Sequence, residues 1–196
     1  MPYLPDNREY RMMSPLEPVQ DSEFIVEGYA ATFEAYRMAT IDGVDYYERI
    51  MPSAFEGSDM SDVIMLYDHT GRVFARQSNG TLELAVDSRG LKIRADLSLT
   101  PAARELYNDI KVGLVTQMSL AFAVDKDHFD TDTRTRVIDH FRKIYDVSAV
   151  SIPANPSTGI SARYFDGVSK DMQELLAREE RSKKAAILRI MLEVNK

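Results

Sequence analysis

Alternating apolar and polar residues run through much of the chain and predict a protein built mostly of β-strands. The stretches FIVEGYAATF (24–33) and DVIMLYDH (62–69) have strand length and are rich in β-branched and aromatic residues. Residues 81–98 form two alternating segments around Asp87-Ser88-Arg89-Gly90, a pattern typical of a β-hairpin. Runs of strands with little helix between them favour a mainly β member of the α+β class, a barrel or a sandwich, over alternating βαβ units.

One segment, residues 100–113, changes to a helical period. Thr100 is suited to cap the helix, and Pro101 suits its first position because that residue needs no amide hydrogen bond. Apolar residues at a spacing of four predict a helical face that packs against the sheet. This face comprises Leu106, Ile110 and Leu114.

Composition divides the chain into three parts. Residues 1–22 contain several prolines and mixed charges and predict an N-terminal arm or a first edge strand, whereas residues 23–168 carry the strands and the helix. Residues 169–196 lack glycine and proline and predict a C-terminal helix, opened by Asp171 and Glu174 in a capping-box pattern. This helix either docks on its own domain or binds a partner or a second copy.

Composition and charge exclude several classes of function. A chain of 196 residues with 44% hydrophobic and 28% charged residues predicts a globular protein, and its net charge of −7 argues against nucleic-acid binding. The absence of cysteine excludes disulfides, thiolate zinc sites and a cysteine nucleophile. No apolar run has the length of a signal peptide or a membrane span. We therefore expect a cytoplasmic protein that binds neither nucleic acid nor membranes.

A serine within an apolar, strand-like stretch is the first candidate for chemistry. Ser119 stands in GLVTQMSLAF (113–122), where its hydroxyl must be hydrogen-bonded or act as a nucleophile. A serine nucleophile needs a base, and the chain has three histidines: His69 at the end of an apolar strand, His128 in a polar connection, and His140 on a charged strand. This pattern by itself leaves a purely structural role open for each of them.

A metal site is the weaker interpretation of the acidic residues around His128. Asp127, Asp130 and Asp132 could be drawn with this histidine as a cluster. A loop rich in aspartate and threonine is more simply a solvated turn. We therefore expect neither a metal ion nor a cofactor.

A series of stretches occurs in a recognisable order: EGYAATF, ERIMPSAF, LYDH, GLKIRADL, ELYNDIKVGLVTQMSLAF and YDVSAVSIPANP. Together they resemble the prohead maturation protease family of tailed bacteriophages, which is similar to the herpesvirus capsid-assembly proteases. The resemblance covers about residues 27–162. It implies a compact closed β-barrel of about seven strands with flanking helices, and it makes residues 23–168 a serine protease domain.

The resemblance also implies three catalytic residues. Ser119 matches the nucleophile in G-x-x-x-x-M-S-x-x-F, and His69 matches the general base in the DH pair. Asp146 in YDVSAVSIPANP matches an acidic helper, although it is a methylene shorter than the glutamate usual there. The third residue of the herpesvirus relatives is a histidine, so His140 remains a competitor for this role.

The implied function is capsid maturation. A member of this family is expected to be an endopeptidase that cleaves capsid scaffolding segments and itself, inside the procapsid assembling in the host cytoplasm. Its expected partners are the major capsid or scaffold protein as substrate and a second copy of the chain, because the herpesvirus relatives work as dimers. Two alternatives stay open: a catalytically inactive module that docks on the assembling procapsid, and a protease unrelated to capsids.

Overall fold

The computed structural model describes residues 8–41 and 43–151, which lie in one compact unit, Met1–Pro156. Its strands are β1 (Glu9–Pro18), β2 (Ile25–Thr32), β3 (Tyr36–Ile41), β4 (Val44–Ile50), β5 (Ile64–Tyr67), β6 (Thr70–Arg76), β7 (Leu82–Val86), β8 (Gly90–Asp96), β9 (Gln117–Asp130) and β10 (Thr135–Val150). Its helices are α1 (Pro101–Lys111) and the short 3₁₀ turns η1 (Pro52–Phe55) and η2 (Gln77–Asn79). The predicted helix of residues 169–196 lies outside the described residues, and the division into three parts stays a prediction.

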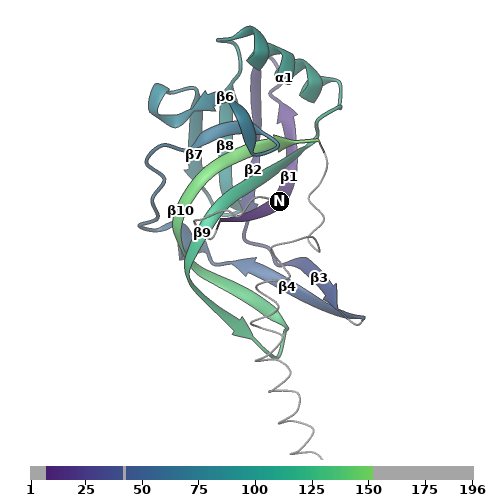
Figure 1. The fold of residues 1–196 in the computed structure, drawn as a ribbon, viewed down its shortest axis with the longest axis vertical. Helices are drawn as coiled ribbons and strands as arrows, with labels where there is room; N and C mark the ends of the chain where they lie inside the picture. Colours follow the sequence, from purple (N-terminus) through teal and green to yellow (C-terminus); the bar gives the residue numbers. More distant parts are fainter. Residues whose placement is uncertain (1–7, 42, 152–196) are drawn as a thin grey trace, which may run out of the picture. The chain divides into compact units, whose positions relative to one another are not determined.

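The strands form an open sheet. Its hydrogen-bonded path runs β3-β4-β10-β9-β1-β2-β8-β7 (Figure 1), and β5 branches from β10 and pairs in turn with β6. The path ends at β3 and at β7, and no pairing within residues 8–151 joins these two strands. Because α1 is also the sole α-helix of the described part, the expected closed seven-stranded barrel with several flanking helices is wrong.

The long strand β10 explains why the sheet branches rather than closes. Along one edge β10 pairs with β9 in antiparallel fashion, over nearly its whole length of 16 residues. Along the other edge it pairs in parallel first with β4, at residues 135–138, and then with β5, at residues 146–149. Because β4 and β5 follow one another along the same edge of β10, the sheet divides there into two branches. Closure of a barrel needs a single continuous ring of strands.

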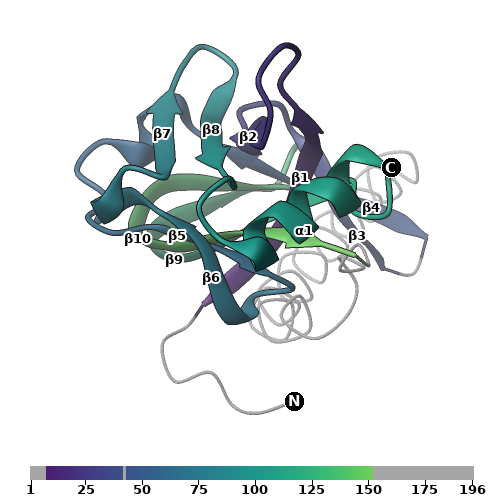
Figure 2. The ribbon, with the colours of Figure 1, turned by 90° about the horizontal axis from the view of Figure 1, so that it is seen from above.

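The predicted hairpin and helix are confirmed. β7 and β8 pair across the turn at residues 87–89, and the hydroxyl of Thr100 accepts a hydrogen bond from the Ala103 amide at 3.1 Å. Leu106 and Ile110 are buried in the core, but Leu114 is 70% exposed because α1 ends at Lys111. Figure 2 shows α1 beside β1 and β6, which it contacts. None of the helices in the described part is long and apolar enough to cross a membrane.

Two segments differ from the pattern-based expectation. β1 lies between β9 and β2, so it is an interior strand rather than an arm or an edge strand. The polar stretch at 126–135 is mostly strand, because β9 continues to Asp130 and only residues 131–134 form the turn into β10. Pairing with β10 supplies the backbone hydrogen bonds there. Among the described strands, β1 pairs with β9 only as far as Phe122, so the far part of β9 is an edge strand, where polar side chains are tolerated.

Candidate active site

Ser119 lies on the face of β9 opposite to the one that contributes Met118 and Leu120 to the hydrophobic core. Across the ladder it pairs with Ser148 of β10. Asp146, two residues before Ser148, shares this face because side chains alternate along a strand. Neighbouring strands thus bring a hydroxyl and a carboxylate to the same side of the sheet.

His69 reaches this face from the tight turn between β5 and β6. Tyr67 pairs with Thr70, and both residues between them have a positive φ, 48° at Asp68 and 58° at His69. Two-residue hairpin turns of this kind favour asparagine and glycine, since other side chains are strained in the left-handed region. Such strain is found mainly where function requires a fixed side-chain direction.

The turn is fastened to the end of β10. The amide of Asp68 donates to the carbonyl oxygen of Ala149 at 3.0 Å. The Asp68 carboxylate in turn accepts hydrogen bonds from the amide and the hydroxyl of Ser151, at 3.1 and 2.9 Å. These contacts hold His69 against the strand that carries Asp146.

A continuous chain of hydrogen bonds joins the three side chains. His69 Nε2 lies 2.7 Å from Ser119 Oγ, and His69 Nδ1 lies 2.7 Å from Asp146 Oδ1. An ionised carboxylate can only accept, so with a neutral ring Nδ1 carries the proton and Nε2 accepts from the serine hydroxyl. Ser119 is 1% exposed and Asp146 is 3% exposed, whereas the His69 side chain is 15% exposed. A serine, a histidine and a carboxylate in this order can act as a nucleophile, its base and the acid that orients the base.

Asp146 is held by further features of β10. The β9–β10 register shifts between Ile144 and Asp146, so a bulge precedes the carboxylate. The fully buried Ser148 donates its hydroxyl hydrogen to Asp146 Oδ1 at 2.7 Å. The same carboxylate oxygen therefore accepts one hydrogen bond from His69 and one from Ser148.

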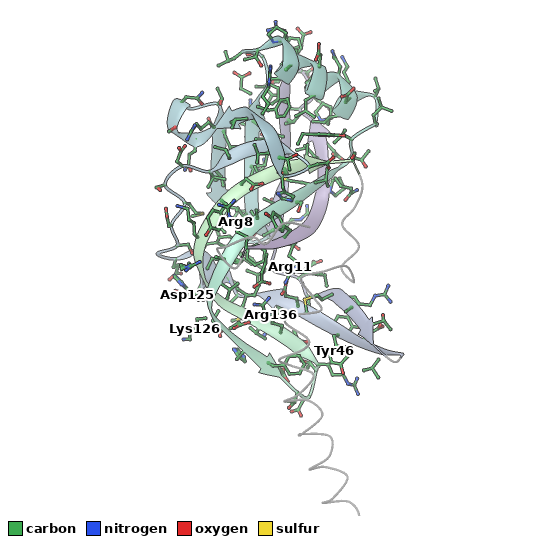
Figure 3. The ribbon with its side chains drawn as sticks, viewed as in Figure 1. Arg8, Arg11, Tyr46, Asp125, Lys126 and Arg136 are labelled. Atoms are coloured by element: carbon green, nitrogen blue, oxygen red, sulfur yellow. The ribbon has the colours of Figure 1, made fainter. Side chains whose placement is uncertain are left out.

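Tyr10 of β1 packs against the imidazole. The two rings meet edge to face with centroids 4.4 Å apart. Burial raises the pKa of Tyr10, and the nearby charge of Asp146 adds to this effect while Arg8 opposes it. Arg8 also lies 3.8 Å from the centre of the Tyr145 ring, and Figure 3 shows it beside β9 and β10.

The other two histidines have different partners. His140 contacts Asp125 at 2.6 Å and the carbonyl oxygen of Glu56 at 3.0 Å, and the hydrogen bond with Asp125 raises the pKa of its ring. His128 lies on β9, not in a loop, and contacts Asp139 at 2.7 Å. His69 and Asp146 are thus brought to Ser119, whereas His140 is held elsewhere on β10.

The acidic residues near His128 also bind separate partners. Asp127 accepts a hydrogen bond from Arg136 at 2.6 Å, and Asp130 accepts from the amides of Asp132 and Thr133. Across the part of the chain that the structure describes, no group of three histidine or acidic side chains is arranged to hold a metal ion.

A buried ionic cluster fastens β1 to the rest of the sheet. Glu48 of β4 accepts hydrogen bonds from Arg11 of β1 at 2.6 and 2.8 Å, from Arg136 of β10 at 3.0 Å, and from the Tyr36 hydroxyl. Glu9 binds both arginines, Arg11 at 2.6 Å and Arg136 at 2.5 and 2.9 Å. Figure 3 shows Arg11 and Arg136 close together where β1, β4 and β10 meet.

Sequence reasoning missed Ser148, Asp68 and Tyr10 as members of the site. Ser148 carries the signal that singled out Ser119, a hydroxyl in an apolar strand, and its position two residues after Asp146 indicates a shared face. Asp68 was visible as the residue before His69, but its bonds to Ser151 depend on tertiary structure. Nothing in the local pattern connects Tyr10 with a turn 59 residues later.

Comparison with known proteins shows the family of the chain. The sequence pattern of the caudovirus prohead serine protease family matches residues 9–173, and the chain belongs to this family. The prohead protease of Enterobacteria phage HK97 is 29% identical over 151 residues, which are 74% of this chain and 62% of that protein. The chain therefore spans less than two thirds of the length of this curated relative. No solved structure matches the chain.

Proposed function

We propose that this protein is a serine endopeptidase that cleaves capsid scaffolding segments, and its own chain, during maturation of a phage prohead. The observation that carries the proposal is the hydrogen-bonded chain from Ser119 through His69 to Asp146, with both contacts at 2.7 Å. Membership of the caudovirus prohead serine protease family supports the proposed place of cleavage, which is the procapsid that assembles in the host cytoplasm.

In this mechanism His69 acts as the general base and then as the general acid. Its Nε2 takes the hydroxyl proton as Ser119 Oγ attacks the scissile carbonyl carbon, and it later gives that proton to the leaving amine as the C–N bond breaks. Water then hydrolyses the acyl-enzyme with the same base, which restores Ser119. Asp146 fixes the tautomer of the ring and stabilises the imidazolium that forms in each step.

Co-expression with the major capsid protein of the same phage tests the proposal. We expect the wild-type protein to shorten the capsid chain or itself and Ser119→Ala to leave both at full length, as measured by intact-mass spectrometry. Ser88→Ala is the matched control, because Ser88 is an exposed serine in the β7–β8 turn. This variant should cut like the wild type.

Two other outcomes would overturn the proposal. Full-length chains in assembled proheads with every variant would favour the alternative, a docking module without catalysis. Unchanged cleavage by Ser119→Ala would assign the reaction to a different nucleophile.

A further inference from the structure

The hydroxyl of Ser148 has a partner that a merely structural serine would not need. Buried serines in strands commonly satisfy their hydroxyl on a nearby backbone carbonyl. Ser148 instead donates to Asp146 Oδ1 at 2.7 Å, the same oxygen that lies 2.7 Å from His69 Nδ1. Ser148 is completely buried and Asp146 is 3% exposed. The ring of His69 and the hydroxyl of Ser148 thus both contact Asp146 Oδ1.

The position of Ser148 in the sheet supports this role. Its backbone pairs with Ser119 of β9 on one side and with Leu66 of β5 on the other. It therefore sits between the strand of the nucleophile and the strand that leads to the His69 turn. A rigid ladder on both sides fixes the donor, so the hydroxyl can hold the carboxylate in one orientation.

We propose that Ser148 is a positioning residue of the Ser119–His69–Asp146 triad: its hydroxyl holds Asp146 Oδ1 toward His69 Nδ1. This inference rests on the proposed function. An aspartate side chain has two rotatable bonds, and a carboxylate held by the imidazole alone can turn away from it. The second hydrogen bond keeps the base aligned for proton transfer, which must occur within a few tenths of an ångström of the productive geometry.

Ser148→Ala tests the inference, with Val147→Ala as the matched control. Val147 is fully buried one residue earlier on β10 and belongs to the hydrophobic core, so its truncation weakens the packing of β10 without touching the Asp146 hydrogen bonds. With purified major capsid protein as substrate, we expect Ser148→Ala to lower kcat about tenfold with little change in KM, because a hydrogen bond to a charged group is lost. Val147→Ala should lower the melting temperature and leave kcat near the wild-type value.

A spectroscopic measurement keeps the test independent of cleavage. The proton on His69 Nδ1 should give a low-field NMR signal in the wild-type protein, because it is held in a short hydrogen bond to a carboxylate. We expect Ser148→Ala to shift or broaden this signal and Val147→Ala to preserve it.

The outcomes separate the inference from the proposed function. If the wild type cleaves and Ser148→Ala keeps both the wild-type kcat and the His69 signal, the positioning role is overturned while the protease function stands. If the wild type cleaves nothing, the proposed function fails. In that case, a His69 NMR signal that changes only in Ser148→Ala still supports the inference that Ser148 holds Asp146 in place. A His69 signal that does not change in Ser148→Ala overturns this inference.

Discussion

Two side chains of β10, Asp146 and His140, were candidates for orienting the imidazole of His69, and their contacts differ. Asp146 lies 2.7 Å from His69 Nδ1, whereas His140 lies 2.6 Å from Asp125 and 3.0 Å from the Glu56 carbonyl oxygen. A carboxylate at Nδ1 supplies the negative charge that an imidazolium needs during catalysis. The contacts therefore favour Asp146 in the proposed mechanism.

Asp146→Asn and His140→Asn form a matched pair of variants that tests this assignment. The asparagine at 146 keeps the shape of the side chain but loses the charge, so we expect kcat on purified capsid protein to fall by about 10⁴-fold, as for the same change in a known serine triad. His140→Asn should leave kcat within about twofold of the wild type, because surface substitutions away from the site have small effects. The reverse result, a large loss only in His140→Asn, would transfer the role to the histidine.

The residues of the candidate site could be predicted from the sequence, but the backbone features that orient their side chains could not. Ser119 and the histidines stand out in the sequence, and the family resemblance selected His69 and Asp146 from the possible partners. The left-handed turn at His69 and the bulge before Asp146 were not predictable, because they arise from strand pairing between distant segments. These two features aim the side chains, so composition and spacing alone do not define the geometry.

Among the strands and helices, the elements set by local signals were predicted well. The turn residues at 87–90 define the β7–β8 hairpin, and Thr100 with Pro101 defines the start of α1. Sheet closure depends instead on which distant strands pair, and hydrophobic alternation carries no information about this choice. The open sheet and the long β9–β10 ribbon were therefore missed.

The close approach of β2 and β8 gives a prediction about stability. A Cβ on Gly90 would lie 2.0 Å from the Ala31 carbonyl oxygen and 2.8 Å from Thr32 Cα, so the backbones must separate to accept any side chain. We expect Gly90→Ala to lower the free energy of unfolding by roughly 3 kcal/mol, the upper part of the range for overpacked sites. Urea denaturation followed by circular dichroism measures this change.

Gly80→Ala is the control for Gly90→Ala. Gly80 has a φ of 76° but no atom within 4 Å of a Cβ, so its substitution introduces backbone strain without a clash. That strain costs about 1 kcal/mol. Equal losses in the two variants would show that the contact between β2 and β8 relaxes freely.

Across the whole described unit, the buried ionic cluster makes stability depend on pH. Burial by itself would raise the pKa of Glu48, but the guanidinium groups of Arg11 and Arg136 outweigh it and hold this pKa below its usual 4.5. A carboxyl whose pKa is lower in the folded protein stabilises the fold fully above its unfolded pKa and loses that contribution as the pH falls through the folded value. The contribution of Glu48 is thus present at neutral pH and lost in acid.

Glu48→Gln tests this dependence. At pH 7 we expect the free energy of unfolding to fall by about 3 kcal/mol, because Arg11 and Arg136 lose the most buried of their negatively charged partners. The difference from the wild type should shrink as the pH drops below about 4.5 in urea titrations at several pH values. Glu34→Gln, at an exposed position, should follow the wild type throughout. A difference that stays constant with pH would contradict the proposed role of the charge.

The pairing of β1 with β9 also determines how late in synthesis the sheet can form. Arg11 pairs with Leu120, so the ribosome must make β9 before β1 gains this neighbour. Ser119 follows His69 by 50 residues, and Asp146 follows still later on β10. Domains fold as units once their partner strands have emerged. A nascent chain therefore lacks the hydrogen bonds that join Ser119, His69 and Asp146 until β10 has left the ribosome.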